Sequence, residues 1–467
     1  MSVISAPYFA FLAVVFVGYW LVAQWPRARM GWLIAASVAF YAHAQGWLVA
    51  WLAATTLIDY ATSRAMARTS SDARRTWLWR VSLASNLALL IGYKALNASP
   101  ADGAGLLAHI ALPLGISYWT FQNIAYVTDV YLEKAPPATS LWTYAAHASL
   151  FPTKLVGPIV RASELLPQLE APPTVSNADL NRALLLILVG VAKKAVIADY
   201  LGSNFVGRVF SNLGFYSSAE TVLASYGYVL QLYADFSGSC DLALGAGLLL
   251  GLKLPINFDR PFLAPNLVEF WQRWHMSLSF WLRDYVFTPL HIALGNVRRS
   301  WRASLGVLFA AYLATFLLCG VWHGIGATYL VWGAMHGVGL WTVRVARMRG
   351  WTSRLRGRWG RGLAIAATFH YVLATLMVFR APTLGDLVPY ASKLAEGTFA
   401  LTNVSPSIAA LMLVGYAMLF APRDTFARVE RAFTAMGPVG LAASILATLI
   451  AVGLFRADSL PFIYNQF

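Results

Sequence analysis

The chain has 467 residues, of which 58% are hydrophobic and only 12% are charged. A soluble fold carries about 25% charged residues, so this composition excludes a protein with a water-facing surface all round. The formal net charge is +15. Because the basic residues cluster in short stretches between apolar runs, they fit the positive-inside rule of membrane proteins and not a nucleic-acid surface. We therefore expect an all-α, polytopic membrane protein that binds no nucleic acid.

A helix needs about 20 apolar residues to cross a bilayer. The first apolar run starts at Ala6, and basic residues Arg27 and Arg29 follow it. That polarity predicts a first span and not a cleavable signal peptide. The runs near 31–62 predict a hairpin, and the stretch 141–157 need not cross. The expected spans lie near 6–24, 31–44, 47–62, 77–95, 104–121, 141–157, 183–202, 219–234, 240–253, 303–321, 327–344, 363–379, 406–421 and 437–455.

The distribution of charge predicts the orientation of these spans. The stretch from Arg344 to Arg361 holds seven arginines and no acidic residue, so we place it in the cytoplasm. Counting spans from there puts both the N-terminus and the C-terminus outside the cytoplasm, which requires an even number of crossings. No polar stretch is long enough for a soluble domain. We therefore expect a single transmembrane domain over residues 1–467.

The segment 254–290 breaks the pattern because it is too polar for a lipid-facing span and too aromatic for a plain loop. Three prolines prevent a continuous helix before Asn266. From Asn266 to Phe287 the pattern predicts a helix, with Asn266 as N-cap and Glu269 three residues on. Irregular backbone at membrane depth survives only inside protein or beside a water-filled cavity. We interpret 254–290 as a re-entrant, cavity-lining segment; the alternative is an amphipathic helix on the cytoplasmic surface.

Among the eight histidines, His323 is the strongest candidate for chemistry. It follows a long uncharged run, and ionisable residues inside membranes are rare and usually functional. A neutral imidazole can take a proton from a hydroxyl near pH 7, so His323 is a candidate general base. The alternative is a histidine that is hydrogen-bonded between helices.

Two further histidines are possible partners of His323. His275 lies in the polar aromatic segment, where it either lines the cavity or is an interfacial histidine capped by water. His336 lies 13 residues after His323, about 20 Å away on an unbroken helix. We therefore favour His275 as the partner. We expect a packing or supporting role for His336 unless Gly324 and Gly326 break the helix.

Polar residues also gather between 235 and 241. The carboxylates of Asp235 and Asp241, with Ser237 between them, could bind a cation or a proton, or cap helix ends. We expect no metal site here. No HExxH, GxSxG or phosphate-binding loop motif is present in the sequence. Lys193 and Lys194 could extend to the cytoplasmic surface or meet an anionic donor.

The run Phe270–Tyr285 reads FWQRWHMSLSFWLRDY and resembles the signature of the membrane-bound O-acyltransferase family, and within it the alginate O-acetyltransferase branch. Similar blocks follow the family's order over most of the chain. They are Leu112–Gln122, Gly157–Arg161, Asp235–Gly238, Gly320–Gly324 and Pro461–Phe467. The sequence departs from the family pattern at Gln272, at Phe280 and over 291–297. These departures leave the family resemblance intact, but the donor-binding surface and the polymer that is acylated do not follow from it.

The resemblance implies a helical fold with a re-entrant segment and a central tunnel through a bacterial inner membrane. It implies that His323 is the catalytic residue and that His275 is its partner across the tunnel. The remaining expected site residues are those that would line the tunnel: Trp322, Trp274, Trp271, Arg273, Asp235 and Ser237.

The resemblance also implies the substrates. The donor is expected to be a cytoplasmic acyl thioester, most simply acetyl-CoA, used as a substrate with no bound cofactor. The acceptor is a hydroxyl of an extracytoplasmic polysaccharide, reached through a periplasmic acetyltransferase partner. Arg298, Arg299 and Arg302 could attract the phosphates of CoA, or they reflect the positive-inside bias.

Three other functions stay open from the sequence. One is the transfer of D-alanine from a carrier protein to a teichoic acid. Another is a transporter or flippase, although only one broken region is present and no matching half accompanies it. The third is a scaffold that only recruits a periplasmic acetyltransferase.

Overall fold

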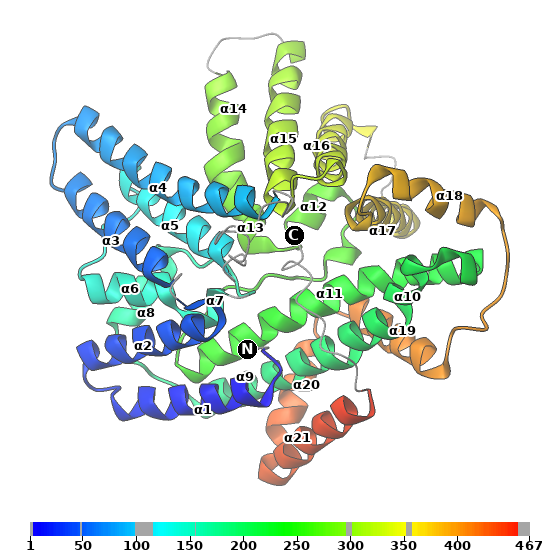
Figure 1. Ribbon diagram of the computed structural model, residues 1–467, viewed down its shortest axis with the longest axis horizontal. Helices are drawn as coiled ribbons and strands as arrows, with labels where there is room; N and C mark the ends of the chain where they lie inside the picture. Colours follow the sequence, from blue (N-terminus) through cyan, green and yellow to red (C-terminus); the bar gives the residue numbers. More distant parts are fainter. Residues whose placement is uncertain are drawn as a thin grey trace. The chain divides into compact units, whose positions relative to one another are not determined.

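The computed structural model describes residues 3–46, 49–98, 115–154, 156–295, 301–351 and 357–455. Every regular element in these ranges is helical, which confirms the predicted all-α fold (Figure 1). The chain divides into two compact units, each described here by itself. Unit 1 comprises Met1–Val189, Ser239–Ile256 and Phe433–Ala435, and unit 2 comprises Gly190–Gly238, Asn257–Ala432 and Met436–Phe467. The single domain and its tunnel stay predictions.

Unit 1 packs apolar helices around a few buried polar groups. Arg29 is one of them: its guanidinium donates to the carbonyl oxygens of Leu169 and Ala171 at 2.6 and 2.8 Å. The stretch expected near 141–157 is two short helices that part at Leu150. The helices of this unit are α1 (Ala6–Leu21), α2 (Pro26–Gln45), α3 (Val49–Met66), α4 (Asp72–Ala98), α5 (Ile116–Tyr131), α6 (Leu141–Ser149), α7 (Phe151–Lys154), α8 (Ala162–Glu170) and most of α9 (Asn177–Val191).

Unit 2 holds most of the segment 254–290 and most of the later helices. Three of its segments are π-helical, namely Ala192–Asp199, Gly202–Val206 and Arg283–Phe287. Its α-helices are α10 (Gly207–Ser211), the first part of α11 (Ser218–Leu249), α12 (Leu267–Trp271), α13 (Met276–Leu282), α14 (Thr288–Gly295), α15 (Trp301–His323), α16 (Ala327–Met348), α17 (Arg358–Arg380), α18 (Leu387–Ala395), α19 (Pro406–Leu419), most of α20 (Thr425–Ala435) and α21 (Gly437–Leu454).

Within the described ranges, three helices are long and apolar enough to cross a membrane. They are Ser304–His323 in α15, the whole of α17, and α21. These helices match expected spans, and α1 and α19 are shorter apolar helices. The number of crossings and the side of each terminus stay predictions. The final block, Pro461–Phe467, lies outside the described residues.

The two spans expected at 219–234 and 240–253 form one continuous helix, α11. Asp235, which lies between the two expected spans, was expected to bind a cation or a proton or to cap a helix end, yet it lies inside this helix and its carboxylate is paired. Its Oδ1 lies 2.9 Å from the Nζ of Lys194, which also lies 2.7 Å from Asp199. A buried charge is tolerated inside a helix when it has a partner. Lys194 is therefore a buried ion-pair residue, and the prediction that it reaches the surface or a donor is wrong.

Helices α15 and α16 form a hairpin whose backbones touch, as their adjacent ribbons in Figure 1 indicate. Glycines allow this approach. A Cβ built on Gly320 would lie 2.3 Å from the carbonyl oxygen of Tyr329, and one on Gly333 would lie 2.3 Å from that of Phe316. Real Cβ atoms do not come so close, so only glycine fits at these positions. The hairpin therefore fixes where α15 ends, at His323.

We predict that Gly333→Ala destabilises the protein by on the order of 1–3 kcal/mol, because the new methyl group forces the two backbones apart. Gly306→Ala on α15 is the matched control, since nothing lies within 4 Å of its Cβ position. The melting temperature of the detergent-purified variants measures the difference. Equal melting temperatures for the two variants would show that the backbones do not touch at Gly333.

Candidate active site

The helix predicted to begin after Asn266 starts as expected and then breaks. The Oδ1 of Asn266 accepts a hydrogen bond from the backbone N–H of Glu269 at 3.0 Å, which confirms the N-cap. However, α12 ends at Trp271, and α13 starts only at Met276. The prediction of one helix from Asn266 to Phe287 is therefore wrong. His275 sits at the break and not inside a helix.

Asn257 explains the break. Its backbone oxygen accepts from the N–H of Met276 at 3.0 Å, and its side-chain Oδ1 accepts from the N–H of Ser277 at 3.1 Å. These two bonds satisfy the first amides of α13, which a continuous helix would satisfy internally. A third hydrogen bond joins the same two segments of the chain: the N–H of Asp259 donates to the carbonyl oxygen of Arg273 at 3.0 Å.

The break places His275 in the left-handed region, with φ 42° and ψ 54°. This conformation costs a residue with a Cβ on the order of 1–3 kcal/mol, and it persists only where the surroundings impose it. Such strained residues cluster at functional sites. The ring of His275 is buried and meets the ring of Phe236 edge to face at 4.6 Å.

His323 is held at the end of α15 by aromatic rings. Its ring lies edge to face with Trp332 at 5.2 Å and with Phe379 at 5.0 Å. Trp322 lies against it at 4.5 Å. The side chain is only 6% exposed. These contacts fix the orientation of the imidazole and exclude bulk water from it.

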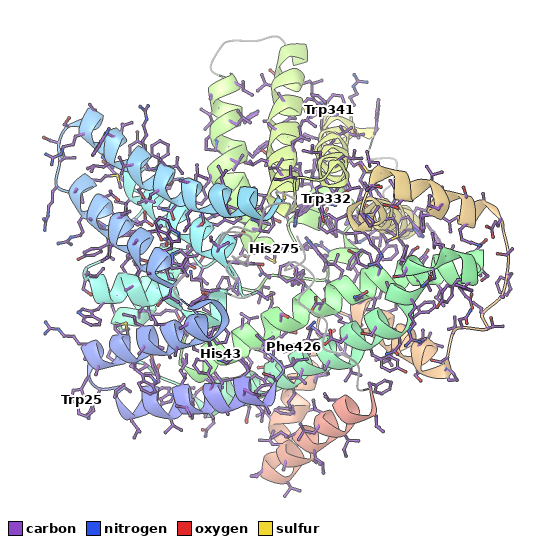
Figure 2. All side chains as sticks on the ribbon, viewed as in Figure 1. Trp25, His43, His275, Trp332, Trp341 and Phe426 are labelled. Atoms are coloured by element: carbon purple, nitrogen blue, oxygen red, sulfur yellow. The ribbon has the colours of Figure 1, made fainter. Side chains whose placement is uncertain are left out.

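His323 and His275 line one cavity of about 20 Å³, measured as the space open to the centre of a water molecule. That volume is enough for about one water. The structure therefore brings together the two histidines that the sequence singled out. Figure 2 labels His275 and Trp332, which both line the cavity. The other residues that line the cavity are Phe270, Trp271, Trp274, Leu278, Trp332, His336, Val372, Leu376 and Phe379.

His336 lines the same cavity because the chain breaks between α15 and α16, which was the condition for its approach to His323. The indole N–H of Trp271 donates to its Nδ1 at 3.2 Å. A tryptophan can only donate, so Nδ1 carries no proton and the neutral ring carries it on Nε2. That Nε2 lies 3.1 Å from the hydroxyl of Thr375, which in turn donates to the carbonyl of Val372. Both ring nitrogens are therefore occupied, in agreement with a supporting role.

Four of the predicted tunnel residues do not line this cavity. Arg273 forms an ion pair with Glu269 at 3.0 Å. Trp322 contacts the ring of His323 but is not among the residues that line the cavity. Asp235 is paired with Lys194, and Ser237 is buried on α11. Of the basic residues proposed to attract CoA, Arg298 and Arg299 lie outside the described residues, as does the side chain of Arg302.

Asp235 lies one residue before Phe236, which contacts the site. The ion pair with Lys194 fixes this turn of α11, and the next residue, Phe236, presents its ring to His275. The Lys194–Asp235 pair is thus one contact removed from the cavity. It is a positioning element and not a group that could touch a substrate held there.

The sequence reasoning missed Trp332 and Phe379. Both are buried, both line the cavity, and both contact His323. Trp332 also has an indole Nε1–H that is buried without a hydrogen-bond acceptor among the described residues. An aromatic residue in an apolar run has the pattern of ordinary core packing, so no local signal marks either residue.

Comparison with known proteins gives a consistent picture. A sequence model of the membrane-bound O-acyltransferase family matches residues 133–377. The peptidoglycan O-acetyltransferase of Helicobacter pylori is 32% identical over 85% of this chain and 79% of its own length. A probable alginate O-acetylase of Pseudomonas fluorescens is 33% identical over 91% and 83%. The teichoic acid D-alanyltransferase of Bacillus subtilis is 31% identical over 57% and 68%.

We predict that Lys194→Met destabilises the protein by about 3–5 kcal/mol, because it leaves the carboxylates of Asp199 and Asp235 buried without their cation. Lys193→Met is the matched control: it removes the neighbouring lysine, whose amine lies over the ring of Tyr233. Chemical unfolding in detergent measures both variants. A Lys194→Met protein as stable as the control would contradict a buried ion pair.

Proposed function

Because the chain belongs to the membrane-bound O-acyltransferase family and is an O-acyltransferase, we propose that it moves an acetyl group from acetyl-CoA in the cytoplasm toward a hydroxyl of an extracytoplasmic polysaccharide. The relatives that cover 85% and 91% of the chain are named for O-acetylation of peptidoglycan and of alginate. The observation that carries the proposal is the cavity shared by His323 and His275.

In the proposed mechanism, His323 is the general base. Its neutral imidazole takes the proton of the acceptor hydroxyl while the oxygen attacks the carbonyl carbon of the thioester. A carbon–oxygen bond forms, the carbon–sulfur bond breaks, and the imidazolium returns the proton to the leaving thiolate. In a variant of this route, His323 first accepts the acetyl group on a ring nitrogen and passes it on.

The negative charge that develops on the carbonyl oxygen needs a donor. The indole N–H of Trp332 fits this role because it is buried, lacks an acceptor among the described residues and belongs to a ring 5.2 Å from that of His323. A tryptophan N–H carries no charge and cannot accept a proton, so it would not compete with the base. His275, on the same cavity, positions the donor or acceptor group.

The proposal extends to the setting of the reaction. The protein would lie in a bacterial inner membrane with both termini outside the cytoplasm, as the seven arginines between Arg344 and Arg361 support. A periplasmic acetyltransferase partner would complete transfer to the polymer. The cavity supports a division of labour, since a space of about 20 Å³ is too small for a sugar ring.

The second candidate is D-alanyl transfer from a carrier protein, which the Bacillus subtilis relative favours. We expect purified protein to consume labelled acetyl-CoA and not D-alanine from a charged carrier protein. The same preparation should be offered both donors in parallel, with release of the free thiol as the readout. Turnover of the carrier protein alone would overturn the choice of acetyl-CoA.

We predict that His323→Ala lowers acetyl transfer by roughly 10²–10⁴-fold, the usual contribution of a general base, and by more if the imidazole carries the acetyl group. The matched control is His43→Ala, which removes an exposed histidine of α2. The measurement is transfer of label from acetyl-CoA to an oligosaccharide acceptor in proteoliposomes. Retained transfer in a correctly inserted His323→Ala protein would reject the assigned base.

We predict that Trp332→Phe lowers kcat by about 10²–10³-fold with little change in KM, as removal of one oxyanion donor does. Trp341→Phe on the same helix is the control, since its indole N–H donates to the carbonyl of Leu305 and does not line the cavity. Steady-state kinetics on the two variants separate the effects. An increase in KM alone would assign Trp332 to binding and not to the transition state.

A further inference from the structure

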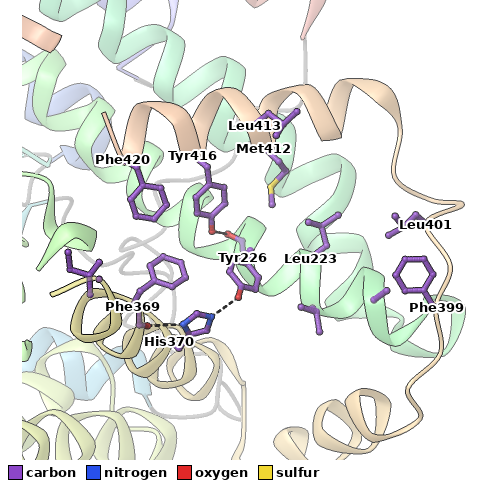
Figure 3. A pocket seen from close by; sticks show the side chains of 15 residues that line it. Leu223, Tyr226, Phe369, His370, Phe399, Leu401, Met412, Leu413, Tyr416 and Phe420 are labelled. Carbon is purple, nitrogen blue, oxygen red and sulfur yellow. Dashed lines mark hydrogen bonds between the residues drawn. The ribbon is translucent and has the colours of Figure 1, made fainter. Parts of the chain in front are cut away.

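A groove of about 940 Å³ lies in unit 2, apart from the cavity of the two histidines. Figure 3 shows its walls: α17 on one side, α19 above, α11 behind and the segment with Phe399 and Leu401 at the far end. We call it the α17–α19 groove. Its lining is almost wholly apolar. The residues in its walls include Leu223, Phe369, Met412, Leu413 and Phe420.

The few polar atoms in the walls are already satisfied. The hydroxyl of Tyr226 and the Nε2 of His370 lie 2.8 Å apart, and the Nδ1 of His370 lies 2.8 Å from the carbonyl oxygen of Ala366. The hydroxyl of Tyr416 donates to the backbone oxygen of Tyr226. Water entering the groove would find few partners, and apolar cavities stay dry. The groove is therefore built for a hydrocarbon occupant.

Two arginines lie at one end of the groove. The face of α17 that lines the groove carries residues spaced four apart, namely Gly362, Ala366 and His370. Arg358 lies on the same face one turn before Gly362, and Arg361 lies beside Arg358. Both arginines are exposed, and neither forms an ion pair or a side-chain hydrogen bond with the described part of the chain. A hydrocarbon chain in the groove would thus have two unpaired cations at one end.

The stretch of α17 from the arginines to the far end of the groove fits one leaflet of a bilayer. From Arg358 to His370 the helix rises about 18 Å at 1.5 Å per residue. Half of a hydrocarbon core is about 15 Å thick. Because α17 is itself a candidate membrane span, lipid is the solvent that reaches this face.

We propose that the α17–α19 groove binds one anionic membrane phospholipid, with an acyl chain between the helices and the phosphate against Arg358 and Arg361. This site goes beyond the proposed acyl transfer and does not depend on it. It bears on the enzyme through α17, whose Val372, Leu376 and Phe379 line the histidine cavity. The bound lipid packs one face of the helix that holds Phe379 against His323.

The test is native mass spectrometry of the full-length protein with added phosphatidylglycerol or with phosphatidylethanolamine of the same chains. We expect one phosphatidylglycerol to be retained in preference to phosphatidylethanolamine by roughly tenfold or more, because two cations meet the anionic headgroup. The double variant Arg358→Gln/Arg361→Gln should lose this preference. Ala366→Trp, which fills the groove, should lose the retained lipid itself.

The matched control is Arg68→Gln/Arg74→Gln, which removes two exposed arginines of unit 1 and should keep the preference. Melting temperatures without lipid check that each variant is folded, and the arginine variants change only exposed side chains. Equal retention of the two lipids by the wild-type protein would overturn the headgroup contact. Unchanged retention by a folded Ala366→Trp protein would overturn the groove as the site.

Discussion

The cavity depends on the two hydrogen bonds that the backbone amides of Met276 and Ser277 donate to oxygen atoms of Asn257. Without them, α12 and α13 would continue as one helix, and His275 would lie in a straight stripe with its aromatic neighbours. With them, the chain turns at His275, and the residues before and after the turn close around one small space. The strain of a left-handed histidine is the local cost of this arrangement.

A second constraint is that buried polar groups must be satisfied by other protein groups, since hydrocarbon offers none. Such pairing is seen for a polar group that lines the cavity and for one that lies behind it. Trp271 and Thr375 occupy both nitrogens of His336, which fixes its tautomer. Lys194 neutralises Asp235 one contact further away. The groups around the cavity are therefore fixed in place, and His323 is enclosed by the rings of Trp322, Trp332 and Phe379.

The sequence predicted what depends on local pattern: the helical membrane fold, the unusual character of 254–290, the cap at Asn266, and His323 and His275 as the histidines of interest. It failed where a partner distant in the chain decides the outcome. The polar residues around Asp235 look like a helix break until Lys194, 41 positions earlier, is known to pair with the carboxylate. Trp332 and Phe379 carry no local mark, because only the fold brings their rings to His323.

The size of the cavity also bears on the fidelity of the enzyme. Water is itself a hydroxyl nucleophile, and a base beside a thioester would hydrolyse the donor to no purpose. The cavity is large enough for about one water molecule. An acetyl group is larger than a water molecule, so a cavity of this size would have no room for water once an acetyl group had entered it. Under the proposed mechanism, the small volume would therefore protect the thioester from hydrolysis.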